Sequence, residues 1–302
     1  MKNDILLVTG ITGHTGRYFY ETLVQRSCSR KIRLLVRKTS DCSFLANSPL
    51  DIELVYGDLE DDRFLTSAMS GVSEVLHITN IRYSLGIVNT ALKYNVGSVV
   101  CVHTTGIYSR FRVASEEYLT IEDRLQKTIQ AHPDLTVTII RPTMIFGDLC
   151  DRNVSKFIRM IDRFRVFPVI DGGEGLLQPV NARDLGRAYF DVLLLQKEHR
   201  KSEYILSGDH PLTMKELLQS ISGYLGKNTL FVSVPSRLAV SLAKIVHFLT
   251  FGKKDFVEKI QRMTEDRSFS YDQAKGDFSY RPEPFQKGLM REVNAYMQKV
   301  RK

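Results

Sequence analysis

The sequence contains few cysteines, and none of them is spaced as metal sites or redox motifs require. The four cysteines form no C-x-x-C pair and have no histidine at metal-ligand spacing: Cys28, Cys42, Cys101 and Cys150. This pattern gives no support to a zinc site or a disulfide framework. Free thiols are typical of a reducing compartment, so we expect no metal and a cytoplasmic location.

The sequence also lacks any block of five or six like charges. Its 302 residues carry 42 Lys and Arg against 34 Asp and Glu, a formal net charge of +8. Because the basic residues are scattered, the excess favours affinity for anionic small molecules or acidic surfaces and gives no nucleic-acid stripe. Five of the basic residues gather after residue 150, where a solvated helix face or an anionic substrate would explain them: Arg152, Lys156, Arg159, Arg163 and Arg165.

No internal repeat or low-complexity segment is visible, and residues 1–4 run directly into an apolar stretch, so we expect no signal peptide. Residues 236–251 are apolar but shorter than the roughly twenty residues of a membrane span. We expect a buried helix or a subunit contact there, a homodimer being possible. Arg237, Lys253 and Lys254 keep a membrane-surface anchor open.

The first half of the chain alternates short apolar runs with helical patterns. Strands are predicted at residues 5–8, 32–36, 51–56, 74–78, 98–103 and 135–140. Helices are predicted between them at residues 17–24, 59–69, 83–94 and 114–131. This alternation is typical of an α/β protein with a doubly wound parallel sheet.

The chain after residue 170 has a looser rhythm. Helices are predicted at 182–195, 213–225, 236–251 and 285–300, and a short strand at 203–206. We expect a Rossmann domain over residues 1–170 and a smaller, mostly helical cap over residues 171–302, with residues 180–206 packing back on the sheet. Ligands of such sheets bind at the carboxyl ends of the strands, where a cap would lie.

The stretch from Asp4 to Gly16 organises this first half. After the apolar run it reads Thr9-Gly10-Ile11-Thr12-Gly13-His14-Thr15-Gly16, with glycines spaced G-x-x-G-x-x-G. Glycine allows the sharp turn, the close approach of backbone N–H groups to a pyrophosphate, and tight packing of the following helix. The pattern predicts a dinucleotide cradle; a plain glycine-rich turn is the alternative.

With these residues the chain resembles an extended or atypical short-chain dehydrogenase/reductase, a family related to NAD-dependent epimerases and dehydratases. The opening matches the family's T-G-x-x-G-x-x-G. Other matches follow in order: Gly57-Asp58-Leu59, Arg141-Pro142, Val180-x-x-x-Asp184 and the tail Phe278-Ser279-Tyr280-Arg281-Pro282 with Phe285 and Gly288-Leu289.

The resemblance implies a set of cofactor-binding residues. Asp58 would accept from the adenine amino group and Leu59 would lie beside the ring, although Asp58 could also cap a helix from Glu60. The full set is Gly10, Thr12, Gly13, His14, Thr15, Gly16, Arg37, Lys38, Asp58, Leu59, Thr79, Asn80 and Pro142. The segment after the fourth strand, with His77, departs from the family pattern, and we interpret His77 as a core residue at the strand end.

The choice of dinucleotide depends on the end of the second strand. NAD-preferring sites carry an acidic residue about twenty positions past the glycines. This chain has Arg37 and Lys38 there instead. An arginine fork suits a 2′-phosphate, so we expect NADP(H), with NAD possible; solvated strand-end charges are the alternative.

The catalytic residues follow the family less closely. The family's Tyr-x-x-x-Lys is matched by Tyr118, but Glu122 stands at the lysine position. Thr104, or its neighbour Thr105, matches the family's hydroxyl at the end of the fifth strand. A phenol without a nearby cation is a poor base at neutral pH, and a carboxylate beside it would raise its pKa further. Tyr118 could still act as a neutral acid, or Tyr118 and Glu122 could be helix-surface residues.

Two functions follow. One is an NAD(P)-dependent oxidoreductase or epimerase/dehydratase acting on a nucleotide-sugar or another anionic small molecule. The other is a catalytically impaired dinucleotide sensor, because Glu122 replaces the lysine.

Overall fold

A computed structural model describes residues 4–111, 116–249 and 256–300, with the side chains of residues 245–249 left out. Its centre is a seven-stranded parallel sheet of order β3-β2-β1-β4-β5-β6-β11. These strands are β1 (Ile5–Thr9), β2 (Lys31–Val36), β3 (Ile52–Tyr56), β4 (Val72–His77), β5 (Ser98–Val102), β6 (Thr136–Pro142) and β11 (Glu203–Leu206). All five residues of β1 and of β5 are buried, as expected of strands covered on both faces.

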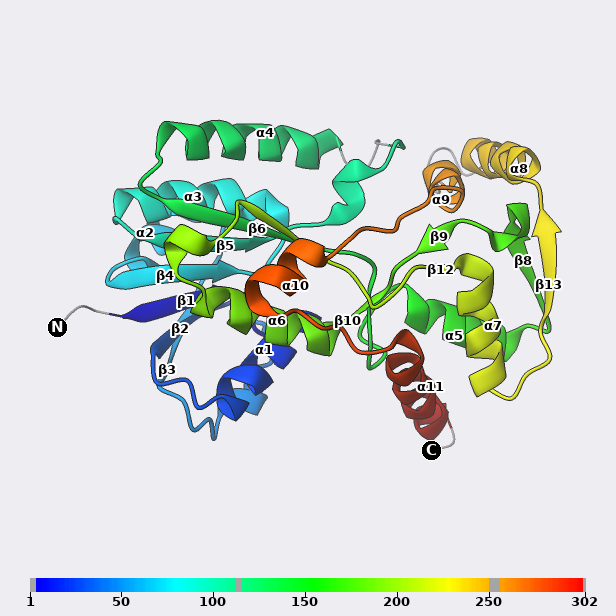
Figure 1. Ribbon diagram of the computed structural model, residues 1–302, viewed down its shortest axis with the longest axis horizontal. Coiled ribbons are helices and arrows are strands. Elements are labelled where there is room, and N and C mark those ends of the chain that lie inside the picture. Colours follow the sequence, from blue (N-terminus) through cyan, green and yellow to red (C-terminus); the bar gives the residue numbers. More distant parts are fainter. Residues whose placement is uncertain (1–3, 112–115, 250–255, 301–302) are drawn as a thin grey trace.

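Helices cover both faces of this sheet (Figure 1). One face carries α1 (His14–Gln25), α6 (Ala182–Leu194) and α10 (Asp272–Phe278); the other carries α2 (Asp62–Ala68), α3 (Ser84–Lys93) and α4 (Glu116–Ala131). The strand order reverses between β1 and β4, so a crevice opens at their carboxyl ends. The predicted doubly wound α/β fold is confirmed.

The remaining elements form the cap at the other end of the molecule (Figure 1). They are β7 (Ile145–Phe146), α5 (Val154–Arg163), β8 (Val166–Ile170), β9 (Leu176–Leu177), β10 (Val180–Asn181), β12 (Leu212–Thr213), α7 (Met214–Tyr224), β13 (Leu230–Val234), α8 (Ser236–Leu249), α9 (Val257–Arg262) and α11 (Phe285–Val300). Most of these strands are short pairs: β10 with β7, β12 with β9, and β13 with β8.

The cap has its own hydrophobic core. Residues of α5 and β8 share it with residues of α7 and α11. Because α5 and β8 precede residue 171, we propose that the cap begins after Pro142 and not at 171. Residues 182–206 supply α6, which packs on α1, and β11, which pairs with β6.

Local signals explain most element boundaries. The helix predicted over 59–69 begins later, at Asp62, because the side chain of Asp61 accepts from the backbone N–H groups of Arg63 and Phe64. A capping box between Thr213 and Glu216 starts α7. Two predicted helix boundaries lie outside the described residues: the start of the helix predicted over 114–131 and the end of the helix predicted over 236–251. No helix in the described part of the chain is long and apolar enough to cross a membrane.

Candidate functional site

The glycine-rich loop lies at the carboxyl end of β1, in the crevice. Gly10 has a φ of +81°, and a Cβ on it would lie 3.0 Å from the backbone nitrogen of Thr79. A Cβ on Gly16 would lie 2.1 Å from the carbonyl oxygen of Gly10. Both positions therefore require glycine, which a plain surface turn would not.

The helix that follows has an open N-terminus. Gly13 is the N-cap of α1, no side chain caps the helix, and its first turn has no acidic residue. Thr12 and Gly13 lie at the surface of this turn, and Thr15 is buried beneath it. Uncapped N–H groups and the positive end of the helix dipole form a site for a phosphate group. The residues present therefore fit the pyrophosphate of a dinucleotide.

The imidazole of His14, the first residue of α1, lies near Gly147, Asp148 and Asp151 at the start of the cap. Its ring contacts Tyr18 edge-on, and burial lowers the pKa of the imidazole, a shift that the charges of Asp151 and Asp148 oppose. Its Nε2 is buried and has no hydrogen-bond partner among the described residues. The candidate role of His14 thus rests on its backbone N–H.

A chain of hydrogen bonds joins β1 and β4 behind the loop. The Thr79 hydroxyl donates to Thr9 Oγ1 (2.9 Å), which lies 2.7 Å from His77 Nδ1, and His77 Nε2 lies 3.2 Å from the carbonyl oxygen of Asn80. Burial lowers the pKa of His77 to about 4, so the ring is neutral, and Nε2 carries its proton toward the carbonyl. The interpretation of His77 as a core residue at the strand end is confirmed, because the side chain is fully buried.

The candidate adenine and ribose residues lie at the neighbouring strand ends. Asp58 is exposed and accepts from the backbone N–H of Glu60 through Oδ1 (3.0 Å), while Leu59 is half-buried. The helix-cap alternative for Asp58 is wrong, because Asp61 holds that position. Arg37 and Lys38 follow β2 directly and are exposed, and neither forms an ion pair within the described ranges.

The hydroxyl candidates at the end of β5 are engaged with the backbone. Thr104 Oγ1 accepts from the N–H of Gly106 (3.0 Å), and the Thr105 hydroxyl donates to the carbonyl of the buried Pro142 (3.3 Å). Tyr118 is half-buried on α4, and the guanidinium of Arg82 lies 5.6 Å from its ring centroid. In the described part of the chain no hydrogen bond joins the Tyr118 hydroxyl to either threonine.

Glu122 is not a helix-surface residue, which corrects that alternative. It is buried, and Arg141 donates to both of its oxygens at 2.5 and 2.7 Å. His103 Nδ1 lies 2.9 Å from the same carboxylate. Burial alone would raise the pKa of Glu122, but these hydrogen bonds more than offset it and the pKa is lowered. The charge that we expected to act on Tyr118 is therefore neutralised inside the sheet–helix interface.

The network around Glu122 extends to the edge strand β11. Arg141 Nε donates to Glu203 (2.6 Å), and the Tyr108 hydroxyl donates to the other oxygen of Glu203 (2.5 Å). Sequence reasoning missed this network. The signal was an arginine at the end of an otherwise apolar strand, since a buried guanidinium requires a carboxylate partner.

The cap covers the carboxyl end of β5 with a segment that the sequence did not single out. Glu265 accepts from the Ser109 hydroxyl and from the N–H of Arg110, both at 2.6 Å. A Cβ on Gly106 would lie 3.3 Å from a terminal nitrogen of Arg262. Burial, then the charge of Arg262, lower the pKa of Arg267. The Nε atoms of both arginines are buried without a hydrogen-bond partner in the described ranges.

No cluster of metal-ligating side chains occurs among the described residues, and the four cysteines are unpaired. The arrangement is thus a phosphate cradle, a strand end carrying hydroxyls, and above it a cap segment that carries Arg262 and Arg267 together with Glu258 and Glu265.

Comparison with known proteins gives one family match and one similar curated protein. Residues 10–156 match the family described as NAD(P)H-binding. Sterol demethylase protein B of Methylococcus capsulatus is 27% identical over 274 residues, covering 78% of this chain and 79% of that protein.

Solved structures share the fold over nearly the whole chain. A UDP-glucose 4-epimerase of Thermotoga maritima, solved with UDP-glucose, has a TM-score of 0.72 at 16% identity and covers 98% of this chain and 99% of its own. A dTDP-glucose 4,6-dehydratase of Streptomyces venezuelae, solved with NAD, has a TM-score of 0.73 at 20% identity and covers 97% of both chains. Residues 10–156 thus match an NAD(P)H-binding family, and the chain has the Rossmann fold of these epimerase and dehydratase structures.

Proposed function

We propose that the chain is an NADP(H)-preferring oxidoreductase or epimerase/dehydratase acting on a small anionic substrate with a carbonyl or hydroxyl group. The observation that carries the proposal is the cap segment held by Glu265 over the end of β5. It places Arg262 beside Gly106 and the hydroxyl of Thr104, and we assign this place to a second ligand beside the dinucleotide.

The anionic substrate is supported by Arg262 and Arg267. Arg262 pairs with Glu258 at 3.5 Å, but its Nε and that of Arg267 are buried without a hydrogen-bond partner in the described ranges, so an anion placed here would accept from donors that the fold leaves open. A phosphate, diphosphate or carboxylate group is such an anion. The UDP-glucose of the Thermotoga maritima relative belongs to the same chemical class.

The dinucleotide supplies the hydride chemistry, and the chain's residues handle the proton. In reduction, the Tyr118 phenol would donate its proton to the substrate carbonyl oxygen, with Thr104 as a second hydroxyl. Arg82 places a cation beside the ring, but it also forms a two-point ion pair with Glu117 at 2.7 and 2.6 Å. We therefore assign Tyr118 as a neutral acid and not as a phenolate base.

The NADP(H) preference rests on Arg37 and Lys38. Replacing Arg37 by Ala should weaken NADPH binding about tenfold or more and leave NADH binding unchanged. The substitution removes the partner of the 2′-phosphate, which NADH does not have. Calorimetric titration of both dinucleotides tests this. Tighter binding of NADH by the unchanged protein contradicts the preference.

Activity is tested by incubating the protein with NADPH and a panel of carbonyl compounds and nucleotide-sugars while following absorbance and new sugars. Tyr118→Phe should lower turnover at least a hundredfold with dinucleotide affinity intact. Unchanged turnover excludes Tyr118 as the acid.

The second candidate function is a sensor of the dinucleotide's redox or phosphorylation state. The burial of Glu122 in an ion pair favours it, since no lysine stands at that position to assist Tyr118. Tight dinucleotide binding with no turnover across the panel would retire the enzyme proposal in favour of this one.

A further inference from the structure

The cap ends in an exposed apolar surface formed by the paired strands β8 and β13. The parallel register places Leu230 opposite Val166 and Val232 opposite Pro168. All four side chains point away from the cap core and are exposed, Leu230 at 62%, Val166 at 54% and Val232 at 42%. Neighbouring Phe164 is 49% exposed. Exposed apolar side chains in such a group mark an interaction site.

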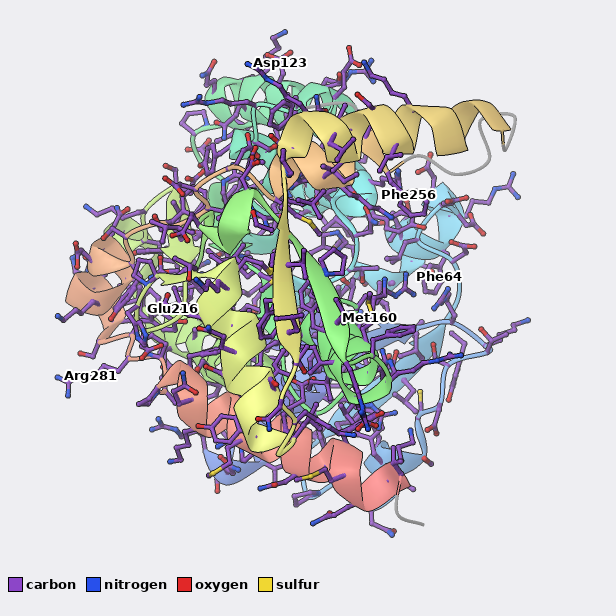
Figure 2. The ribbon with its side chains drawn as sticks, turned by 90° about the vertical axis from the view of Figure 1, so that its right-hand side faces the viewer. Phe64, Asp123, Met160, Glu216, Phe256 and Arg281 are labelled. Atoms are coloured by element: carbon purple, nitrogen blue, oxygen red, sulfur yellow. The ribbon has the colours of Figure 1, made fainter. Side chains whose placement is uncertain are left out.

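Helix α8 follows this strand pair directly and adds to the surface. We expected a buried helix or a subunit contact here. Among residues 236–244, only Ala239 and Ala243 are buried, whereas Leu238 and Leu242 are about half exposed. The two leucines are one helical turn apart, so they form one stripe. Figure 2 looks onto this end of the molecule, with β13 crossing the centre of the view and α8 across the top. We call the exposed side chains of β8, β13 and α8 together with Phe164 the distal face.

The charges of the distal face are of one sign. Residues 217–254 contain no Asp or Glu. Arg163, Arg165, Arg237 and Lys244 are exposed at its edges. Described acidic residues on the flanking elements are engaged: Asp162 pairs with Lys227 at 3.0 Å, Asp171 accepts from the backbone N–H of Ser236 at 2.7 Å, and Glu258 of α9, which packs on α8, pairs with Arg262 at 3.5 Å.

We propose that the distal face binds the surface of a membrane that contains anionic lipids. Exposed apolar side chains insert at the headgroup boundary, and the flanking cations contact anionic headgroups. A second copy of this chain is a poor occupant, because a two-fold contact would place the cationic edges of one copy against the cationic edges of the other. This surface is remote from the glycine-rich loop, so binding there leaves the candidate site accessible (Figure 1).

The test is co-sedimentation of the full chain with large vesicles of phosphatidylcholine, with and without phosphatidylserine. We expect binding only to the vesicles that contain phosphatidylserine, with a loss of binding at high salt. Arg165→Glu should weaken binding more than tenfold, because each basic side chain near an anionic surface favours binding about fivefold. Leu230→Glu should weaken it at least as much, since it removes an inserting side chain and adds a repulsive charge.

Matched controls separate this surface from net charge and hydrophobicity. Lys93→Glu makes the same charge change on α3, and Leu194→Glu changes an exposed leucine at the end of α6. Both should leave vesicle binding unchanged. Failure to sediment with either vesicle, equal binding without phosphatidylserine, or an equal effect of the controls each overturns the proposal. A dimer in gel filtration that Leu230→Glu dissociates, without vesicle binding, assigns the face to self-association instead. Thermal unfolding confirms that the variants are folded.

Discussion

Two buried glutamates, one in each half of the molecule, are in opposite electrostatic situations. Glu122, between α4 and the sheet, accepts from Arg141 and His103, and its pKa is lowered. Glu292, on α11 of the cap, accepts from the backbone N–H of Leu149 at 3.1 Å, and its carboxyl group lies beside the carboxylate of Asp151. Burial, followed by the proximity of Asp151, raises the pKa of Glu292 to about 9.

The difference separates two uses of a buried carboxyl group. Glu122 holds a charge because a guanidinium is fixed beside it, so it joins helix, sheet and edge strand. Glu292 remains protonated at neutral pH and acts as a neutral hydrogen-bonding group. The first stabilises the fold as a charge, whereas ionisation of the second opposes folding.

The largest expected effect comes from restoring the family's lysine. Glu122→Lys recreates the Tyr-x-x-x-Lys spacing but places an ammonium group beside Arg141. We expect loss of folding, or a drop in the free energy of unfolding of more than about 5 kcal/mol, because two buried cations would face each other. Urea unfolding measures it. Asp123→Lys, one residue on and exposed, is the control and should change stability by less than about 1 kcal/mol.

Removing only the charge gives a smaller loss with a defined pH dependence. Glu122→Gln should cost about 3–5 kcal/mol at neutral pH, because Arg141 loses its buried partner. Since the folded pKa of Glu122 is lowered, its contribution is present above its ordinary value of 4.5 and is lost as the pH falls through the folded value. The difference in the free energy of unfolding between wild type and Glu122→Gln must therefore become smaller at acidic pH. A difference that is constant with pH would contradict the charged role.

Glu292→Gln should have the opposite sign. The folded pKa lies near 9 and the ordinary value is 4.5, so the wild-type chain loses stability as the pH rises across that range. The amide has no such loss, and we expect a gain of the order of 1–3 kcal/mol at pH 7. Denaturant unfolding between pH 5 and pH 9 measures it, with the exposed Glu198→Gln as a control. A variant less stable than wild type at pH 8 overturns the comparison.

Asp151→Asn gives the smallest effect. The amide can still accept from the N–H groups of Asn153 and Ser155, as Asp151 does at 2.7 and 3.1 Å. Its missing charge should lower the pKa of Glu292, but burial keeps that pKa above 4.5. We expect the free energy of unfolding to change by less than about 1 kcal/mol. The fall in stability with rising pH, which ends at the folded pKa of Glu292, should end at a lower pH than in the wild type. An unchanged pH range would show that Asp151 does not act on Glu292.

The sequence predicted the features that local patterns encode. Apolar runs predicted the strands of the sheet, and the glycine spacing predicted the cradle, because Gly16 meets the carbonyl oxygen of Gly10 within the same loop; the contact of Gly10 with Thr79 after β4 depends on tertiary packing. It could not give the partner of Glu122, since Arg141 lies on a strand that only tertiary packing brings beneath α4. The placement of Arg262 near Gly106 depends in the same way on how the cap folds back.

Other misses had a readable signal. The strand β13 is a short apolar run, Leu230-Phe231-Val232-Ser233-Val234, between Asn228-Thr229 and Pro235, which is a strand pattern with breakers at both ends. Helix α5 was interpreted only through its basic residues, although Val154, Ile158 and Ile161 mark its buried side.

The route of the chain has a consequence for dissecting the protein. It leaves the sheet after β6, returns for α6 and β11, leaves again for α7, β13, α8 and α9, returns with α10 beside β11, and ends in the cap with α11. A single proteolytic nick in one connection therefore leaves both halves tethered through the others. Neither half corresponds to one continuous gene fragment, so exchanging caps between relatives requires several grafted segments at once.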